Sequence, residues 1–199
     1  MRIAVLWHQK PYMKVQRCLL IDYRDPIPTG AAKSRVSVFA EELANQLGFT
    51  PGDPMESIVS EVGGVIAYRN PVGVEKPESI RVKPDGSFKI FLPSVTSFGR
   101  DRFTIAHELG HFFLHFPLVQ AEGAGLGMVA TRWVDETNAT LQRCEWEANW
   151  FAASFVMPKD EFEDVHRSGG ISEVAYRFGV TEAAATVRAR SLGLQANPA

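Results

Sequence analysis

Apolar residues recur at helical spacing in the first part of the chain. Within VSVFAEELANQLGF, residues 36–49, the positions Phe39, Leu43 and Leu47 repeat every four residues, and a glycine follows where the helix would end. A second, shorter helix is predicted for MESIVSEVGG, residues 55–64. Both patterns are typical of helices that cover a core with one face.

Alternating apolar and polar positions predict strands. GVIAYRN, residues 64–70, reads as one strand, and SIRVKPDGSFKIFLP, residues 79–93, alternates on both sides of Asp85 and Gly86. Asp-Gly is a pair that tight hairpin turns favour, so we expect a β-hairpin there. Residues 2–7, RIAVLW, also alternate and are followed by linker-like sequence rich in Pro, Gly and Ser.

The second half of the chain is predicted to be mainly helical. FTIAHELGHFFLH, residues 103–115, is apolar nearly all round, and its helix is expected to begin near Asp101 and to stop by Pro117. Residues 120–137 are glycine-rich and polar, which predicts a loop. ATLQRCEWEANWFAASFVM, residues 139–157, has the length and composition of a second long helix.

The C-terminal stretch, residues 172–194, divides at Gly179 into two short helical pieces. Taken together, these elements predict an α+β fold that is mainly helical, with a small antiparallel sheet or hairpin beside the helix of residues 103–115.

Composition narrows the class of protein. The chain has 199 residues, 45% of them hydrophobic, and a formal net charge of -2, which is typical of a globular protein and not of a strongly basic nucleic-acid binder. Cys18 and Cys144 give no disulfide framework. Neither a signal peptide nor a membrane-spanning segment is recognisable, so a cytoplasmic location is expected.

His107 and His111 carry the strongest chemical signal. On a helix they lie about 40° apart and about 6 Å along the axis, so both imidazoles can reach one ion. Glu108 lies about 60° around from His111, so its carboxylate would lie beside that ion, where a bound water would be. The alternative is that each histidine is a hydrogen-bonded core residue. Three ionisable groups on a buried helix need compensation, which favours a metal, and zinc suits imidazole and carboxylate ligands.

A third ligand is expected on the helix of residues 139–157. Glu145 shares its face with small and apolar residues suited to packing on the first helix, so we predict that His107, His111 and Glu145 hold one Zn²⁺ per chain. Glu147 lies about 200° around the helix and remains the alternative, more consistent with pairing to a nearby cation. His115 is about 12 Å along the axis from His107, too far to share the ion, which favours a role at the helix end or behind a ligand.

At this point the chain resembles the ImmA/IrrE family of bacterial metallopeptidases. The resemblance rests on RFTIAHELGHFFLH, EWEANWFAASFVMP and VAYRFGVTEAAATVRARSLGL, and spans roughly residues 37–194. It implies a zincin-like fold in which His107, His111 and Glu145 bind zinc and Glu108 is the catalytic base. The chain departs from the family in the segment before Arg35, and in FVMP where LLMP is usual.

The resemblance also implies a function and a domain arrangement. Family members cut a partner regulator, often a helix-turn-helix repressor, in a stress response or mobile-element switch, and some belong to toxin–antitoxin pairs. We therefore expect an N-terminal extension of unknown role (1–35), a metallopeptidase domain (36–165) and a C-terminal helical segment packed on it (166–199).

Two other functions compete with proteolysis. Arg177, Arg188 and Arg190 lie near FGVT between the last two helical pieces, which could form a helix-turn-helix that binds DNA. A zinc-containing antitoxin without peptidase activity is the other alternative. The residue that stabilises an oxyanion is left open among Tyr68, His115 and His166.

Overall fold

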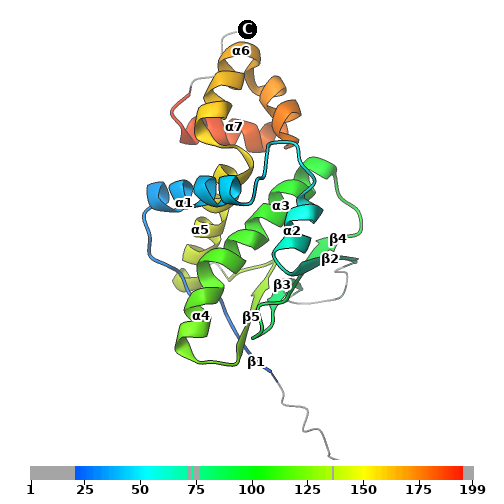
Figure 1. Ribbon diagram of the computed structural model, residues 1–199, viewed down its shortest axis with the longest axis vertical. Coiled ribbons are helices and arrows are strands. Elements are labelled where there is room, and N and C mark those ends of the chain that lie inside the picture. The colour runs from blue at the N-terminus through cyan, green and yellow to red at the C-terminus, as the bar shows by residue number, and fades with distance from the viewer. Residues whose placement is uncertain (1–20, 71–72, 74–76, 136, 195–199) are drawn as a thin grey trace, which may run out of the picture.

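The computed structural model describes residues 21–70, 73, 77–135 and 137–194 (Figure 1). The strand predicted for residues 2–7, and Cys18, lie outside the described residues. The strands are β1 (Asp22–Arg24), β2 (Gly64–Arg69), β3 (Glu78–Val82), β4 (Phe88–Pro93) and β5 (Leu126–Thr131). The helices are α1 (Lys33–Gln46), α2 (Met55–Glu61), α3 (Phe98–Gly110), the π-helix η1 (His111–His115), α4 (Phe116–Glu122), α5 (Ala139–Val156), α6 (Lys159–Phe178) and α7 (Glu182–Ser191).

The predicted hairpin is confirmed as β3 and β4, which pair antiparallel near the middle of the sheet. In the described part of the chain the sheet has five strands in the order β1-β5-β3-β4-β2. β2 and β1 join it parallel to β4 and β5, so the sheet is mixed rather than wholly antiparallel. The α+β, zincin-like fold class predicted from the sequence is confirmed.

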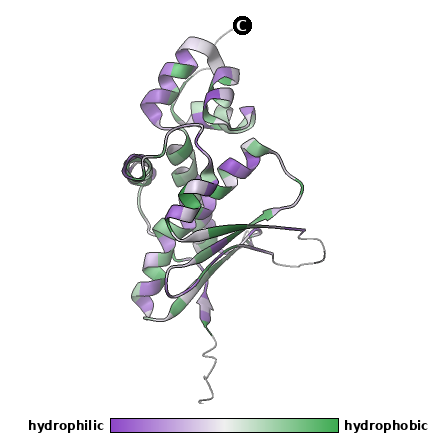
Figure 2. Ribbon diagram, turned by 45° about the vertical axis from the view of Figure 1, so that its right-hand side comes forward, coloured by the Kyte–Doolittle hydropathy of each residue, from purple (hydrophilic) through white to green (hydrophobic). Residues whose placement is uncertain are grey.

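Helices gather on one face of the sheet (Figures 1 and 2). Along β3 and β4, alternate residues such as Ile80, Val82, Ile90 and Leu92 are fully buried, because strand side chains point to opposite faces in turn. The helices α1 and α3 both pack against α5, which runs through the middle of this layer. The predicted helices of residues 36–49, 55–64 and 139–157 are present as α1, α2 and α5.

The strand β5 lies in the stretch of residues 120–137, and the prediction of a loop there was wrong for residues 126–131. Gly127 explains the error. A Cβ at this position would lie 2.6 Å from the Tyr23 ring and 2.8 Å from the Val82 carbonyl oxygen. The glycine therefore permits close packing of three strands rather than marking a turn.

The helix that carries the two histidines begins at Phe98, with Asp101 in its first turn, and does not stop at Pro117 as predicted. It continues through η1 into α4, where Pro117 occupies the first turn. The missing N–H of proline costs little there, because the first N–H groups of a helix have no partner within it.

The division predicted at Gly179 is confirmed. Gly179 ends α6 with a φ of 61°, a left-handed conformation that favours glycine, and α7 follows. The domain boundary predicted at residues 165–166 lies inside α6, which bends at Gly170. In Figure 1, α6 and α7 lie at the end of the molecule opposite β1. Within the described ranges, no helix combines the length and apolar character needed to cross a bilayer.

Candidate metal centre

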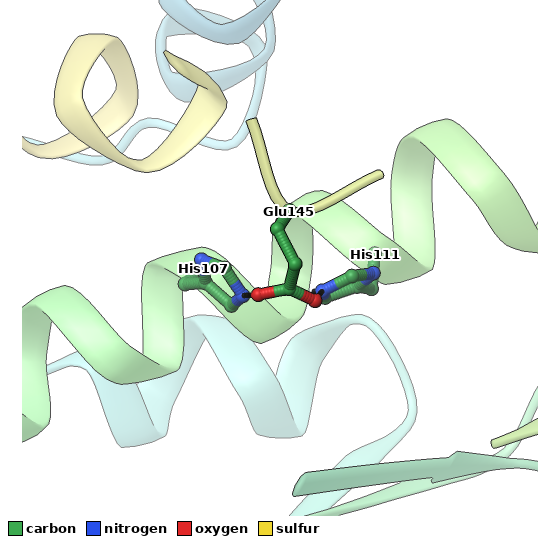
Figure 3. Close-up of side chains that lie close together, drawn as sticks. All are labelled: His107, His111 and Glu145. Atoms are coloured by element: carbon green, nitrogen blue, oxygen red, sulfur yellow. Dashed lines mark hydrogen bonds and ion pairs between the residues drawn. The ribbon is translucent and has the colours of Figure 1, made fainter. Parts of the chain in front are cut away.

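Three of the predicted site residues meet at one point (Figure 3). His107 comes from the end of α3 and His111 from the start of η1, one turn apart, with their Nε2 atoms separated by 3.1 Å. Glu145 reaches them from α5, with one carboxylate oxygen 3.3 Å from His107 Nε2 and the other 3.2 Å from His111 Nε2. The structure thus places a carboxylate between two imidazoles.

Gly110 lets α5 come close enough for this contact. A Cβ at Gly110 would lie 3.0 Å from the Cα of Ala148 and 3.2 Å from its carbonyl oxygen. Both distances are tighter than ordinary packing, so a side chain there would push the two helices apart. The glycine between Leu109 and His111, and the small Ala148 opposite, therefore set the distance over which Glu145 must reach.

The spacing of the three ligand atoms fits a metal ion. A tetrahedral ion bound at about 2.0–2.1 Å holds its ligand atoms about 3.3 Å apart. The two Nε2 atoms lie 3.1 Å apart, and each lies 3.2 or 3.3 Å from a different oxygen of Glu145. With one ligand atom taken from each residue, the three atoms lie within 4.8 Å of one another, so a small shift of the carboxylate brings one oxygen to the ion. Nitrogen and oxygen donors in this number leave a further position for water or substrate, as in catalytic zinc sites. This group could therefore bind a metal ion.

Electrostatics in the site favour a charged carboxylate. Burial would raise the pKa of Glu145, but the hydrogen bonds to His107 and His111 outweigh it and hold that pKa well below its usual range. Burial would lower the pKa of His107, but the hydrogen bond to Glu145 and the negative charges of Glu108 and Glu145 raise it overall. The site thus concentrates negative charge, which a divalent cation would neutralise.

Glu108 is buried beside the three-residue group, and within the described part of the chain one of its carboxylate oxygens accepts no hydrogen bond. Glu108 is 3% exposed, and its Oε2 atom has no hydrogen-bond partner among the described residues. A buried carboxylate oxygen without a hydrogen-bond partner lowers the stability of the folded protein. A bound water or substrate would supply the missing partner, which is consistent with the base role predicted for Glu108.

His107 is held from behind by a residue of α5. Asn149 Oδ1 lies 3.1 Å from His107 Nδ1, so the imidazole N–H can donate to the amide oxygen and leave Nε2 free for an ion. Asn149 also lines a mostly apolar groove of about 520 Å³. The groove's other lining residues come from α1, α3, α5 and α7, and include Phe103, Trp150 and Val187.

His115 and Glu147 do not join the three-residue group, and they contact each other instead. His115 Nδ1 lies 3.0 Å from His111 Nδ1, and His115 Nε2 lies 3.2 Å from Glu147 Oε2. Glu147 also accepts from Arg143 Nε at 2.9 Å, the cation pairing expected from the sequence. Burial and the neighbouring His111 lower the pKa of His115 to about 3, so its ring is neutral.

The contact between Glu147 and the N-terminal segment was not predicted from the sequence. The N–H and hydroxyl of Thr29 both donate to Glu147 Oε2 at 2.8 Å, and the N–H of Gly30 donates to Oε1 at 2.9 Å. These residues are more than a hundred positions apart along the chain, and no motif links them. The segment predicted as an extension of unknown role therefore contacts a carboxylate that is linked to His111 through His115.

The remaining candidates for an oxyanion role stay apart from the group. Tyr68 on β2 is 56% exposed, and His166 on α6 stacks against Phe162. Among the described residues neither forms a hydrogen bond or ion pair with His107, His111 or Glu145. Their assignment stays a prediction.

The arginines behind the DNA-binding alternative are partly used within the fold. Arg188 is buried and donates to Ser154 and to the carbonyl of Met157. Arg177 pairs with Glu161 on α6. The Arg188 contacts join α7 to α5 and to the residue that follows it, so this arginine is not available at the surface. Arg177 and Arg190 are at the surface, so DNA binding by them stays a prediction.

Comparison with known proteins supports a metallopeptidase-type domain. A family model described as the IrrE N-terminal-like domain, Peptidase_M78, matches residues 68–190. No curated protein matches the chain. Among solved structures, a Mycobacterium tuberculosis transcriptional regulator has a similar fold, with a TM-score of 0.55 and 20% identity. The match covers 78% of this chain and 46% of the regulator, so the chain spans less than half of that protein.

Proposed function

The chain belongs to the IrrE N-terminal-like domain family, and we propose that it is a zinc-dependent endopeptidase that cleaves a partner regulatory protein. The family match supports a metallopeptidase-type domain. The observation that carries the proposal is the His107–His111–Glu145 group, whose ligand atoms lie within 4.8 Å of one another, with the incompletely bonded carboxylate of Glu108 next to it.

The residues of the site divide the work of peptide hydrolysis. His107, His111 and Glu145 would hold the ion, which when bound would supply Lewis-acid polarisation of the scissile carbonyl and a lowered pKa for the attacking water. Glu108 takes the proton of that water and later passes it to the leaving amine. Asn149 keeps the His107 ring oriented with Nε2 toward the site. The burial of Glu108 keeps its carboxylate from being solvated by bulk water.

We propose that the substrate is a helix-turn-helix repressor or a toxin–antitoxin partner, cut in a stress response or mobile-element switch. The resemblance to the ImmA/IrrE metallopeptidases supports this. The similar fold of the Mycobacterium tuberculosis protein is that of a transcriptional regulator by its title, and it adds no information about the substrate of this chain.

The proposal is tested by incubating the zinc-loaded protein with the helix-turn-helix regulator encoded nearest to its gene and identifying fragments by mass spectrometry. Wild type is expected to cut at one site, and Glu108→Gln to be at least about 100-fold slower while still binding zinc. Glu173→Gln, which changes an exposed glutamate on α6, is the matched control and should cut normally.

Equal cleavage by wild type and Glu108→Gln would contradict the proposed role of Glu108. Zinc-loaded wild type that binds the regulator without cutting it would favour the zinc-containing antitoxin, in which Glu108 matters only for folding.

A further inference from the structure

A chain of hydrogen bonds runs from the back of His111 to the N-terminal segment. His111 Nδ1 lies 3.0 Å from His115 Nδ1, and His115 Nε2 lies 3.2 Å from Glu147 Oε2. Thr29 and Gly30 donate to the same carboxylate. His111 is 1% exposed and His115 and Glu147 are both 0% exposed, so the bonds among these three residues are closed to bulk water.

The proton positions along this chain follow from the metal site. If His111 binds an ion through Nε2, its Nδ1 carries the proton and donates it to His115 Nδ1. His115 must then carry its own proton on Nε2, and this N–H donates to Glu147 Oε2. Each ring is thus in one tautomer, and each orientation is fixed by the next residue.

Glu147 is anchored more firmly than either histidine. Besides His115 it accepts from the Thr29 N–H and hydroxyl, the Gly30 N–H and Arg143 Nε, all at 2.8 or 2.9 Å. An ionised carboxylate has only acceptor sites, so it can take all these donors at once. The carboxylate is therefore a fixed point to which the rings of His115 and His111 are aligned.

We propose that His115 and Glu147, anchored by Thr29 and Gly30, are positioning residues that hold His111 in the tautomer and orientation required for metal binding. The inference rests on the proposed metal site. It gives the segment before α1 a role, because residues 29–30 supply three of the donors that fix Glu147. Residues behind a metal-bound histidine typically change metal affinity by about 10- to 100-fold when they are removed.

Zinc affinity tests the proposal directly, measured by competition with a chromophoric chelator. His115→Phe keeps a ring of similar size but removes both hydrogen bonds, and we expect it to bind zinc about 10- to 100-fold more weakly. His115→Gln offers an acceptor and a donor again and should recover most of that loss. His166→Phe is the matched control, since His166 is also a buried histidine, and its zinc affinity should equal that of wild type.

The thermal midpoint of each metal-free variant separates positioning from a purely structural role. The proposal expects zinc affinity to differ between His115→Phe and His115→Gln at similar metal-free midpoints. A His115→Phe protein that binds zinc within about twofold of wild type would overturn the positioning role of His115 and leave the proposed function intact. Wild type that binds no zinc would remove both proposals.

The ring-nitrogen NMR spectrum of the zinc-loaded wild type decides the question without any substitution. The hydrogen-bond chain from His111 through His115 to Glu147 predicts that His115 carries its proton on Nε2 alone and that His111 carries its proton on Nδ1. A His115 protonated on Nδ1, or on both nitrogens, would overturn the proposal even if His115→Phe failed to fold.

Discussion

Glu145 and Glu147 lie two residues apart on α5, yet their surroundings differ completely. Glu145 is partly exposed, and it contacts the imidazoles of His107 and His111 at 3.3 and 3.2 Å. Glu147 is fully buried and accepts from Thr29, Gly30, Arg143 and His115. One carboxylate has capacity left for an ion, whereas the other has none. Similar residues on opposite faces of one helix thus serve binding and support.

The largest effect on stability is expected on the supporting face. Glu147→Ala leaves the buried His115 and the half-buried Arg143 without their acceptor, and breaking such a buried pair costs up to about 3–5 kcal/mol. Glu145→Ala should change the free energy of unfolding of the metal-free protein by no more than about 1 kcal/mol. Chemical denaturation of both variants without metal measures the contrast, and equal losses would erase it.

Metal removal should instead act through the face that carries Glu145. If zinc binds only the folded state, wild type gains about 2.7 kcal/mol of stability at a free zinc concentration 100 times the dissociation constant. A chelator should therefore lower the thermal midpoint of wild type and leave that of Glu145→Ala unchanged. A Glu145→Ala protein stabilised by zinc as strongly as wild type would show that Glu145 is not a ligand.

The close approach of the two helices can be tested at Gly110. Gly110→Ala places a Cβ 3.0 Å from the Cα of Ala148, and overpacking of this kind costs about 1–3 kcal/mol. Because α5 must move away, zinc affinity should fall as well. Gly86→Ala, in the hairpin turn where nothing lies within 4 Å of the added Cβ, is the control for backbone effects alone and should leave zinc affinity unchanged. Unchanged zinc affinity in Gly110→Ala would contradict the distance argument.

The smallest expected effect is on the pH dependence of the free energy of unfolding, and it comes from the buried thiol of Cys144. Burial, together with the nearby charge of Glu147, raises the pKa of Cys144 to about 12, while an unfolded thiol titrates near about 8.5. Above pH 9 the unfolded chain releases this proton and the folded chain keeps it, so the free energy of unfolding falls as pH rises.

Serine at this position does not titrate and can still donate to the carbonyl of Pro26, as the thiol of Cys144 does. The decline between pH 9 and pH 11 should therefore be shallower in Cys144→Ser than in wild type, measured by denaturation at each pH. Parallel declines would show that the thiol does not contribute.

Much of the site could be predicted because its spacing is local. His107, Glu108 and His111 lie within two turns of one helix, and the face of α5 that carries Glu145 follows from helical periodicity. The hairpin was predictable from its alternation and its Asp-Gly turn. These features depend on a few neighbouring residues, so the sequence contains them directly.

The features that escaped prediction depend on packing between distant segments. Gly127 was taken for a loop residue because its reason, the ring of Tyr23 across the sheet, is not local. Thr29 and Gly30 donate to Glu147 from more than a hundred positions earlier in the chain, and neither composition nor periodicity indicates this contact. Pro117 was taken for a helix end, although the helix continues through η1 into α4, where the proline lies in the first turn.

Zinc content tests the central claim most directly. Elemental analysis of protein never exposed to a chelator should find about one zinc per chain in wild type and in Glu108→Gln, and none in Glu145→Ala. Wild type without zinc, and unable to take up added zinc, would contradict the account, because His107, His111 and Glu145 would then be only a hydrogen-bonded cluster in the core.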